Sequence, residues 1–403
     1  MTADAADLDR HDALASYRGH FVGTDTPLVY FDGNSLGRPL AVTADRLAAF
    51  VREEWGGRLI RGWDERWYDL PLTLGDQIGR VCLGAAPGQT FVGDSTTVLL
   101  YKLIRAAVDS AGPGRTEIVI DTDNFPTDRY VVEGVAAERG LTVRWVEVDS
   151  AAGITPELLG PALGASTALV VLSHVAYRSA HLADGEAITR QVHDAGALVL
   201  WDLSHAVGSV PLALDGWGVD LAVGCTYKYL NGGPGSPAFG YVASAHQDAL
   251  RQPVQGWMGH ADPFLMGPGY TPSTGVRRFI SGTPAVVGML ALADMVELVD
   301  KAGMEAVRAK SVALTSYALE LADEVLAPAG VTAASPRDAE RRGGHVTLSH
   351  PRMREVVATL WERDVIPDYR DPSGLRIGLS PLSTSFAEVA AGIAAMHDAL
   401  TAA

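Results

Sequence analysis

A lysine and an aspartate, each placed directly after a strand-like apolar run, are the residues of this chain best suited to chemistry. Lys228 follows the run Leu221–Cys225 and precedes a glycine-rich loop, Asn231–Gly235. Asp202 follows the run Ala197–Trp201 and lies 26 residues before Lys228. Lysine is rarely buried unless its amine is engaged. An amine that holds an aldehyde and a carboxylate that keeps a pyridine nitrogen protonated are what pyridoxal phosphate requires, so the pair predicts a site for this cofactor.

Two residues beside this pair could assist it. His205 lies three residues after Asp202 and could hydrogen-bond the carboxylate or the cofactor, although a solvent-facing histidine fits the sequence equally well. Tyr227 directly precedes Lys228 and could bind a phosphate or donate a proton, whereas Tyr229 on the other side fits a packing role better. An aspartate at a strand end is often only a cap or a turn residue, so Asp202 indicates a catalytic site only in combination with Lys228.

A phosphate group binds main-chain N–H groups at the start of a helix and nearby hydroxyls. The segment Gly93-Asp94-Ser95-Thr96-Thr97 precedes an apolar helical pattern and offers both, which makes Thr96 and Thr97 candidate phosphate ligands. The segment Phe125-Pro126-Thr127-Asp128 could place an aromatic face on the pyridine ring and a carboxylate near its substituents. Hydroxyl-rich caps and proline-initiated helices are common, so both segments also have an ordinary structural interpretation.

Arg376 stands on an otherwise apolar strand-like run, Gly374–Ser380. A guanidinium group there suits a two-point grip on the α-carboxylate of an amino acid, and a structural ion pair with an acidic side chain suits it equally well. The candidates for contact with an aromatic substrate ring are Trp63, Trp67, Trp257 and His260. Taken singly, each of these is more typical of a core or an interface.

The composition limits the class of protein. A chain of 403 residues, 47% hydrophobic and 20% charged, can form a large domain and a smaller one, each with its own core. The net charge of −16 argues against a nucleic-acid partner, because phosphate backbones bind basic surfaces. No apolar stretch has the length of a membrane span, the acidic N-terminus lacks a signal-peptide core, and two cysteines form no disulfide framework. We expect a cytoplasmic protein without a metal site.

Short β-branched runs alternate with helical patterns between Phe91 and Tyr241. The alternation predicts an α/β fold with a mostly parallel, doubly wound sheet. The expected strands are Glu117–Asp121, Thr142–Val148, Ala168–Ser173, Ala197–Asp202, Leu221–Cys225 and Ala238–Val242. The expected helices include Thr97–Asp109, Thr127–Arg139 and Gly185–Ala195. Sites in such sheets form at the carboxyl ends of the strands, where Asp202 and Lys228 lie.

We predict three parts along the chain. Residues 1–50 form an N-terminal segment that packs with the small domain, residues 51–290 form the large cofactor-binding domain, and residues 291–403 form a small α+β domain. The elements expected in the small domain are strands at His345–Leu348 and Leu375–Leu379, a helix at Met353–Arg363 and a last helix from Phe386. Arg376 therefore belongs to the small domain and Lys228 to the large one.

Several segments, in the same order along the chain, resemble the kynureninase family of the class V aminotransferase superfamily. The matching segments are Phe31–Gly37, Phe125–Asp128, Trp201–Ala206, Gly224–Phe239, Gly256–His260 and Gly374–Ser380. The resemblance extends from about Tyr30 to Ser385, and the segment Gly33–Gly37 and the lysine loop are specific to this family. It implies the fold type I architecture of pyridoxal phosphate enzymes, with a large domain and a smaller α+β domain.

The resemblance also implies roles for individual residues. Lys228 matches the Schiff-base lysine, Tyr227 a tyrosine at the phosphate and Asp202 the carboxylate at the pyridine nitrogen. The further implied cofactor contacts are Thr96, Thr97, Phe125, Asp128, Ser173 and His205, with Trp257 and Thr283 reaching the phosphate held by the other subunit of a homodimer. The implied substrate contacts are Arg376, Asn34, Ser35 and Trp63.

The implied activity is the pyridoxal phosphate-dependent hydrolysis of L-kynurenine or 3-hydroxy-L-kynurenine to anthranilate or 3-hydroxyanthranilate and L-alanine, in tryptophan catabolism. An aminotransferase, or an enzyme of natural-product synthesis that acts on a substituted kynurenine, is the alternative. A cysteine desulfurase needs a cysteine on a mobile loop beyond the lysine, and no cysteine follows Cys225. A binding protein without catalysis has no need of the amine, and the spacing in Gly232-Gly233-Pro234-Gly235 does not fit a dinucleotide-binding loop.

Overall fold

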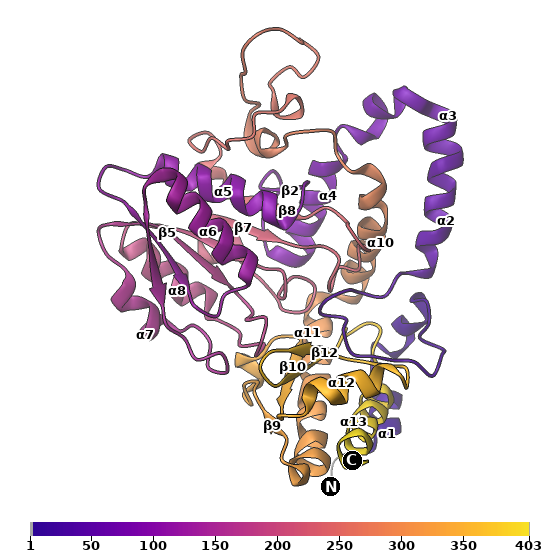
Figure 1. Ribbon diagram of the computed structural model, residues 1–403. Coiled ribbons are helices and arrows are strands. Elements are labelled where there is room, and N and C mark those ends of the chain that lie inside the picture. Colours follow the sequence, from indigo (N-terminus) through magenta and orange to yellow (C-terminus); the bar gives the residue numbers. More distant parts are fainter. Residues whose placement is uncertain (1–2, 403) are drawn as a thin grey trace.

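A seven-stranded sheet forms the centre of the larger part of the molecule in the computed structural model, which describes residues 3–402 (Figure 1). Its strands are β2 (Thr90–Val92), β3 (Glu117–Asp121), β4 (Thr142–Val146), β5 (Thr167–Ser173), β6 (Leu198–Asp202), β7 (Leu221–Gly224) and β8 (Phe239–Val242). They are ordered β2-β8-β7-β6-β5-β3-β4, and only the two pairs that involve β8 are antiparallel. The predicted mostly parallel sheet is confirmed.

Helices cover both faces of this sheet. They are α4 (Leu70–Ile78), α5 (Thr96–Ser110), α6 (Pro126–Arg139), α7 (Pro156–Leu159), α8 (Gly185–Asp194), α9 (Leu214–Trp217) and α10 (Val286–Ala302). Ile118 and Ile120 of β3 belong to a core cluster with α5 and α6, whereas Val119 between them belongs to a cluster with α4, α8 and α10. The central strands β3, β5, β6 and β7 are buried on both faces and are nearly continuous apolar runs, which is the pattern that the sequence showed.

Local signals define the two helices that border the site. The Ser95 hydroxyl caps α5 by accepting a hydrogen bond from the Val98 N–H at 3.4 Å. Pro126 occupies the first turn of α6, where its lack of an N–H costs nothing, and Gly140 ends the helix with a φ of 67°. The N–H groups of Thr96 and Thr97, in the first turn of α5, have no partner inside the helix, so they are available to an anion at this end.

A four-stranded antiparallel sheet organises the C-terminal part. Its strands are β9 (Thr332–Ala333), β10 (His345–Ser349), β12 (Asp368–Arg370) and β13 (Gly374–Gly378), in the order β12-β13-β10-β9, and its helices are α11 (Met304–Leu321), α12 (Met353–Trp361) and α13 (Phe386–Thr401). Val346 and Ile377 belong to the core cluster that these helices share. Thr347 and Arg376 pair across β10 and β13, and their side chains bond main-chain carbonyls of residues 178 and 177, so the opposite face meets the large sheet's loops.

The N-terminal segment contacts both parts. Helix α1 (Ala5–His11) packs against α13, and β1 (Val29–Tyr30) pairs with β11 (Val365–Ile366). Helices α2 (Ala41–Ala49) and α3 (Gly56–Arg58) and short turns then lead into α4. Phe31 lies in the small core, whereas Phe21 and Leu40 lie in the large one, and the predicted boundary at residue 290 falls inside α10. The division into three domains stays a prediction.

Figure 1 also shows a loop that stands away from the body between the short helical turns η8 (Trp257–Gly259) and η9 (Gly275–Phe279). This loop carries three large apolar side chains that are mostly exposed, Phe264, Leu265 and Met266. Among residues 3–402 no helix is both long and apolar enough to cross a membrane.

Candidate active site

One cavity of about 80 Å³ brings together most of the predicted cofactor residues. Those that line it are Thr96, Thr97, Phe125, Asp128, Ser173, Asp202, His205, Tyr227 and Lys228. Five more residues that were not predicted from the sequence line the cavity: Leu100, Thr127, Val175, Tyr177 and Ser204. Thr127 and Ser204 lie inside segments that carry predicted site residues, and Val175 and Tyr177 follow the carboxyl end of β5. The rule that sites form at strand ends would have pointed to that loop as well.

The lysine loop is held by a tight turn. The Gly232 N–H donates to the Thr226 carbonyl at 2.9 Å, and Asn231 between them adopts a φ of 48°, a conformation that asparagine tolerates better than most residues. The N-terminal segment lies against this turn, since the Gly37 N–H donates to the Tyr227 carbonyl at 2.8 Å. A Cβ atom at Gly37 would come within 2.5 Å of the Lys228 carbonyl oxygen, so only glycine permits this approach.

The Lys228 amine faces an imidazole and an aromatic ring. Its Nζ lies 3.0 Å from Nε2 of His205 and 5.7 Å from the ring centroid of Phe125, and the residue is 8% exposed. Burial and the neighbouring charge of Lys228 hold the pKa of His205 well below its usual value, so the imidazole is neutral. A neutral imidazole carries one proton, on Nδ1 or on Nε2, so Nε2 of His205 can accept a hydrogen bond from the Lys228 amine or donate one to it.

Two acidic side chains meet at the floor of the cavity. Asp202 ends β6, and its Oδ1 accepts a hydrogen bond from the Ser204 N–H at 2.8 Å. Asp128 is 1% exposed, and burial, together with the negative charge of Asp202, raises the pKa of its carboxyl group well above the usual value. The raised pKa favours the protonated form of Asp128, and a neutral carboxyl group can lie beside Asp202 without repulsion.

The opposite end of the cavity suits a phosphate group. Thr96 and Thr97 occupy the first turn of α5, where N–H groups and the helix dipole favour an anion. The loop before this helix is fixed by Lys102, which is fully buried and whose Nζ bonds Asp94 at 2.5 Å and the Phe279 carbonyl at 2.8 Å. The cavity thus offers an amine, an anion and a phosphate-binding helix end, and these residues fit pyridoxal phosphate.

The predicted substrate residues Arg376, Asn34 and Ser35 lie together but do not line this cavity. Arg376 is 1% exposed; its Nη1 donates to the Tyr177 carbonyl at 2.7 Å, and its Nη2 donates to the Ser35 hydroxyl at 2.9 Å and to Asp368. The ion pair that the sequence left open as an alternative is therefore present. Asn34 is fully buried, and within residues 3–402 neither polar atom of its amide has a hydrogen-bond partner.

Three predicted site residues lie away from Lys228. Trp63 and Thr283 line a separate apolar groove of about 340 Å³, together with Trp55. Trp257 is 38% exposed, and its ring centroid lies 6.0 Å from that of Phe264. A single chain does not bring these residues to the cavity, so the roles of all three stay predictions, and those of Trp257 and Thr283 need a second subunit.

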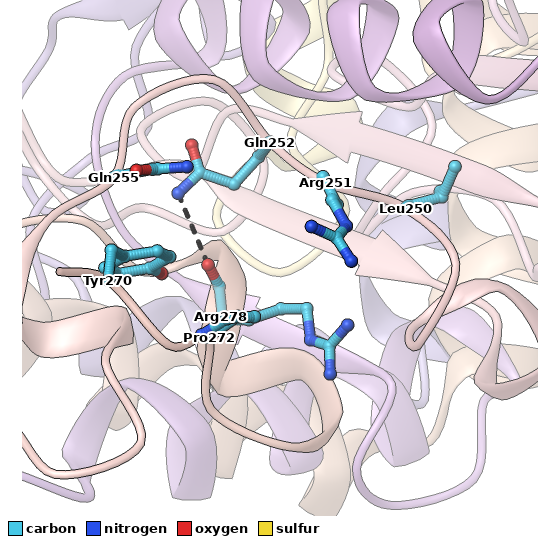
Figure 2. A pocket seen from close by; sticks show the side chains of 7 residues that line it. All are labelled: Leu250, Arg251, Gln252, Gln255, Tyr270, Pro272 and Arg278. Atoms are coloured by element: carbon cyan, nitrogen blue, oxygen red, sulfur yellow. Dashed lines mark hydrogen bonds between the residues drawn. The ribbon is translucent and has the colours of Figure 1, made fainter.

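A smaller cavity of about 50 Å³ lies at the base of the projecting loop (Figure 2). Three of its polar side chains bond main-chain carbonyls: Gln252 bonds those of Val254 and Arg278, Tyr270 bonds that of Gly259, and Arg278 bonds that of Ser273. These bonds hold the loop in place, which gives the residues around this cavity a structural role.

The cysteines offer no reactive thiol. Cys225 follows β7 and is 2% exposed. Burial raises the pKa of its thiol, which keeps the thiol protonated and unreactive. Among the described residues there is also no group of three or more histidine, cysteine or acidic side chains placed to hold a metal ion.

Comparison with known proteins defines first the class and then the family. The fold matches that of the enzyme C-DES, solved with glycine covalently linked to its pyridoxal phosphate cofactor, with a TM-score of 0.82 and 19% identity over 94% of this chain and 99% of that one. The central sheet and this match define an α/β fold that is shared with this pyridoxal phosphate-containing protein. Residues 307–396 match the model of the kynureninase C-terminal domain.

Two kynureninases resemble the chain over nearly its whole length. That of Pseudomonas fluorescens is 41% identical over 393 residues, 96% of this chain and 92% of the relative. That of Burkholderia pseudomallei strain 1106a is 39% identical over 403 residues, 98% and 95% of the two chains. The chain belongs to the kynureninase family, and the family resemblance predicted from the sequence is confirmed.

Proposed function

We propose that this enzyme hydrolyses L-kynurenine, or its 3-hydroxy form, to anthranilate or 3-hydroxyanthranilate and L-alanine, with pyridoxal phosphate as cofactor, in tryptophan catabolism. Family membership over nearly the whole chain supports this reaction. The single structural observation that carries it is the cavity in which the Lys228 amine, the Asp202 carboxylate and the threonines of α5 lie together. An aminotransferase with the same residues is less favoured, because the relatives at about 40% identity are kynureninases.

The residues of the cavity have distinct tasks in holding the cofactor. When bound, pyridoxal phosphate supplies an aldehyde that links to the substrate amine and a ring that accepts the electron pair released at Cα. Asp202 would hold the proton on the pyridine nitrogen, and the neutral Asp128 beside it keeps the two acids from repelling each other. Phe125 and Ser173 complete the wall around the ring, and Thr96, Thr97 and Tyr227 form the phosphate end.

Lys228 and its neighbours move the protons. With the cofactor holding the substrate amine, the Lys228 amine would be free to take the Cα proton, and its burial would keep bulk water from that step. His205 remains neutral and accepts or donates at Nε2, 3.0 Å from the amine, so it can hold the amine in either protonation state. Burial raises the pKa of Tyr227, which keeps its hydroxyl protonated and ready to donate when water adds to the γ-carbonyl.

The substrate would extend from this cavity toward Arg376. We assign its α-carboxylate to the guanidinium of Arg376, with Asn34 and Ser35 as polar neighbours, because Asn34 is a fully buried amide whose polar atoms lack partners among residues 3–402. Trp63 is proposed for the aromatic ring.

We propose a cytoplasmic homodimer with shared active sites. Trp257 and Thr283 are exposed on the single chain, and Thr283 shares an apolar groove with Trp55 and Trp63, so a second copy that covers this side would bury exposed aromatic surface. In such a dimer, Trp257 and Thr283 reach the phosphate held by the other subunit.

One experiment tests the function. The purified holoenzyme is incubated with L-kynurenine and, in parallel, with 3-hydroxy-L-kynurenine, and the fluorescent aromatic product and alanine are quantified. We expect the two products in equal amounts. A ketoacid-dependent exchange of the substrate amine without aromatic amine release would instead establish an aminotransferase.

A further inference from the structure

Asp368 accepts a hydrogen bond from the guanidinium nitrogen of Arg376 that a substrate carboxylate would need as its donor. The strands β12 and β13 pair antiparallel with Asp368 opposite Arg376, and Arg370, two residues along β12, points from the same face as Asp368. Arg376 is almost completely buried, and the side chain of Asp368 is 17% exposed. The ion pair between them therefore has little competition from solvent.

The donor inventory of Arg376 decides what a carboxylate can do. A guanidinium can bind both oxygens of a carboxylate along either of two edges. One edge consists of Nε and Nη2 and the other of Nη1 and Nη2, so both edges include Nη2. The two hydrogens of Nη2 are already directed at Asp368 and at the Ser35 hydroxyl, the latter at 2.9 Å. A two-point grip on a substrate carboxylate consequently requires that one of these partners leaves.

Asp368 is the partner that has another place to go. Its Oδ2 also lies 2.9 Å from Nη2 of Arg370, whose side chain is 37% exposed. Among residues 3–402, Nε of Arg370 is a buried donor without a partner. A carboxylate that turned from Arg376 toward Arg370 would satisfy this donor, so the exchange leaves neither charge unpaired. It would also remove the negative charge that would otherwise repel the arriving substrate.

We infer that Asp368 is a positioning residue that holds the place of the substrate α-carboxylate on Arg376 and transfers to Arg370 when an amino acid binds. The inference rests on the proposed role of Arg376. In the free enzyme, Asp368 neutralises the buried guanidinium of Arg376. A ligand carboxylate must displace Asp368, so Asp368 lowers the affinity of the site for every carboxylate. Only a ligand that also makes the other contacts of the site then binds well.

The test compares two ligands that differ only by the carboxylate. L-alanine and ethylamine are titrated into the holoenzyme, and the change in visible absorbance gives each dissociation constant. Asp368→Asn keeps the shape and an oxygen acceptor but removes the competing charge. This substitution should lower the dissociation constant of L-alanine by about tenfold, which corresponds to a typical coupling energy between two neighbouring charged groups. The dissociation constant of ethylamine should change by less than about twofold.

A matched control removes the same charge from the same hairpin. Asp371 pairs with Arg354 on the surface, where their side chains are 77% and 69% exposed, so Asp371→Asn should change neither ligand. Equal effects of Asp368→Asn on both ligands, or no tightening of L-alanine, would overturn the inference. If Asp368→Asn loses its cofactor or its fold, Arg370→Gln is tested instead. Because this variant lacks the cation to which Asp368 would transfer, the affinity for L-alanine should fall by about tenfold and that for ethylamine should not change. An unchanged affinity for L-alanine would overturn the inference.

The wild-type enzyme separates this inference from the function on which it rests. A wild-type enzyme that binds ethylamine as well as L-alanine has no carboxylate site at Arg376, and the role of Arg376 then fails together with the inference. A wild-type preference for L-alanine that Asp368→Asn leaves unchanged would overturn the role of Asp368 alone.

Discussion

Replacing Arg376 by lysine separates its two roles, as a substrate ligand and as a structural joint. The lysine ammonium can still pair with Asp368, but it cannot also reach the Tyr177 carbonyl and the Ser35 hydroxyl, which lie 2.7 and 2.9 Å from the guanidinium nitrogens. Two hydrogen bonds at about 1 kcal/mol each are lost, so the free energy of unfolding should fall by about 2 kcal/mol. If the same fork grips the substrate, a further loss of about 1.5–3 kcal/mol in binding raises the KM for L-kynurenine by about ten- to a hundredfold.

A second buried arginine provides the matched control. Arg342 is also 1% exposed and also donates to a serine hydroxyl, that of Ser316, at 2.9 Å; its other donor contacts are the carbonyls of Pro336 and Arg337, at 2.7 and 2.8 Å. Arg342→Lys should therefore lower the melting temperature about as much as Arg376→Lys and leave KM unchanged.

The assay measures melting, bound cofactor and steady-state kinetics on both variants. Cofactor content should be nearly normal in Arg376→Lys, because this arginine does not line the Lys228 cavity. A KM for L-kynurenine that matches that of the Arg342→Lys control would refute the assignment of Arg376 to the substrate carboxylate.

Three further predictions follow from the site and its surroundings. Lys228→Ala should abolish the yellow colour of the purified enzyme, and a cofactor that borohydride still fixes to this variant would contradict the assignment of the lysine. Mixing Lys228→Ala with Trp257→Ala, each inactive alone, should restore part of the activity through hybrid dimers with one intact site; a fully active monomer in sedimentation would disprove the shared site. Burial raises the pKa of Asp121 from 3.8 to about 7, so the folded state keeps a proton that the unfolded chain releases, and stability should fall as the pH rises between these values. Asp121→Asn removes this titration and should raise the melting temperature at pH 8 but not at pH 4, and equal changes at both pH values would show that the carboxyl group does not titrate in this range.

Much of the large domain could be predicted because its signals are local. The strands around Asp202 and Lys228 are apolar runs long enough to cross a buried sheet, and their ends agree with the structure to within two residues. A parallel sheet collects its strand ends at one edge, so these two residues had to lie near each other once the alternation of strands and helices was recognised.

What the sequence by itself determined is the fold class, the cofactor and the family, whereas Lys228 as the reactive amine and Asp202 as its carboxylate stay predictions. Only the tertiary structure decided that His205 contacts Lys228, that Asp128 holds a proton beside Asp202, and that Asp368 rather than solvent occupies Arg376. It also placed Trp63 in a groove away from the cavity. The physical reason is that these contacts depend on how packed elements meet and on burial, which shifts the protonation of acids and imidazoles, and neither is encoded in local periodicity.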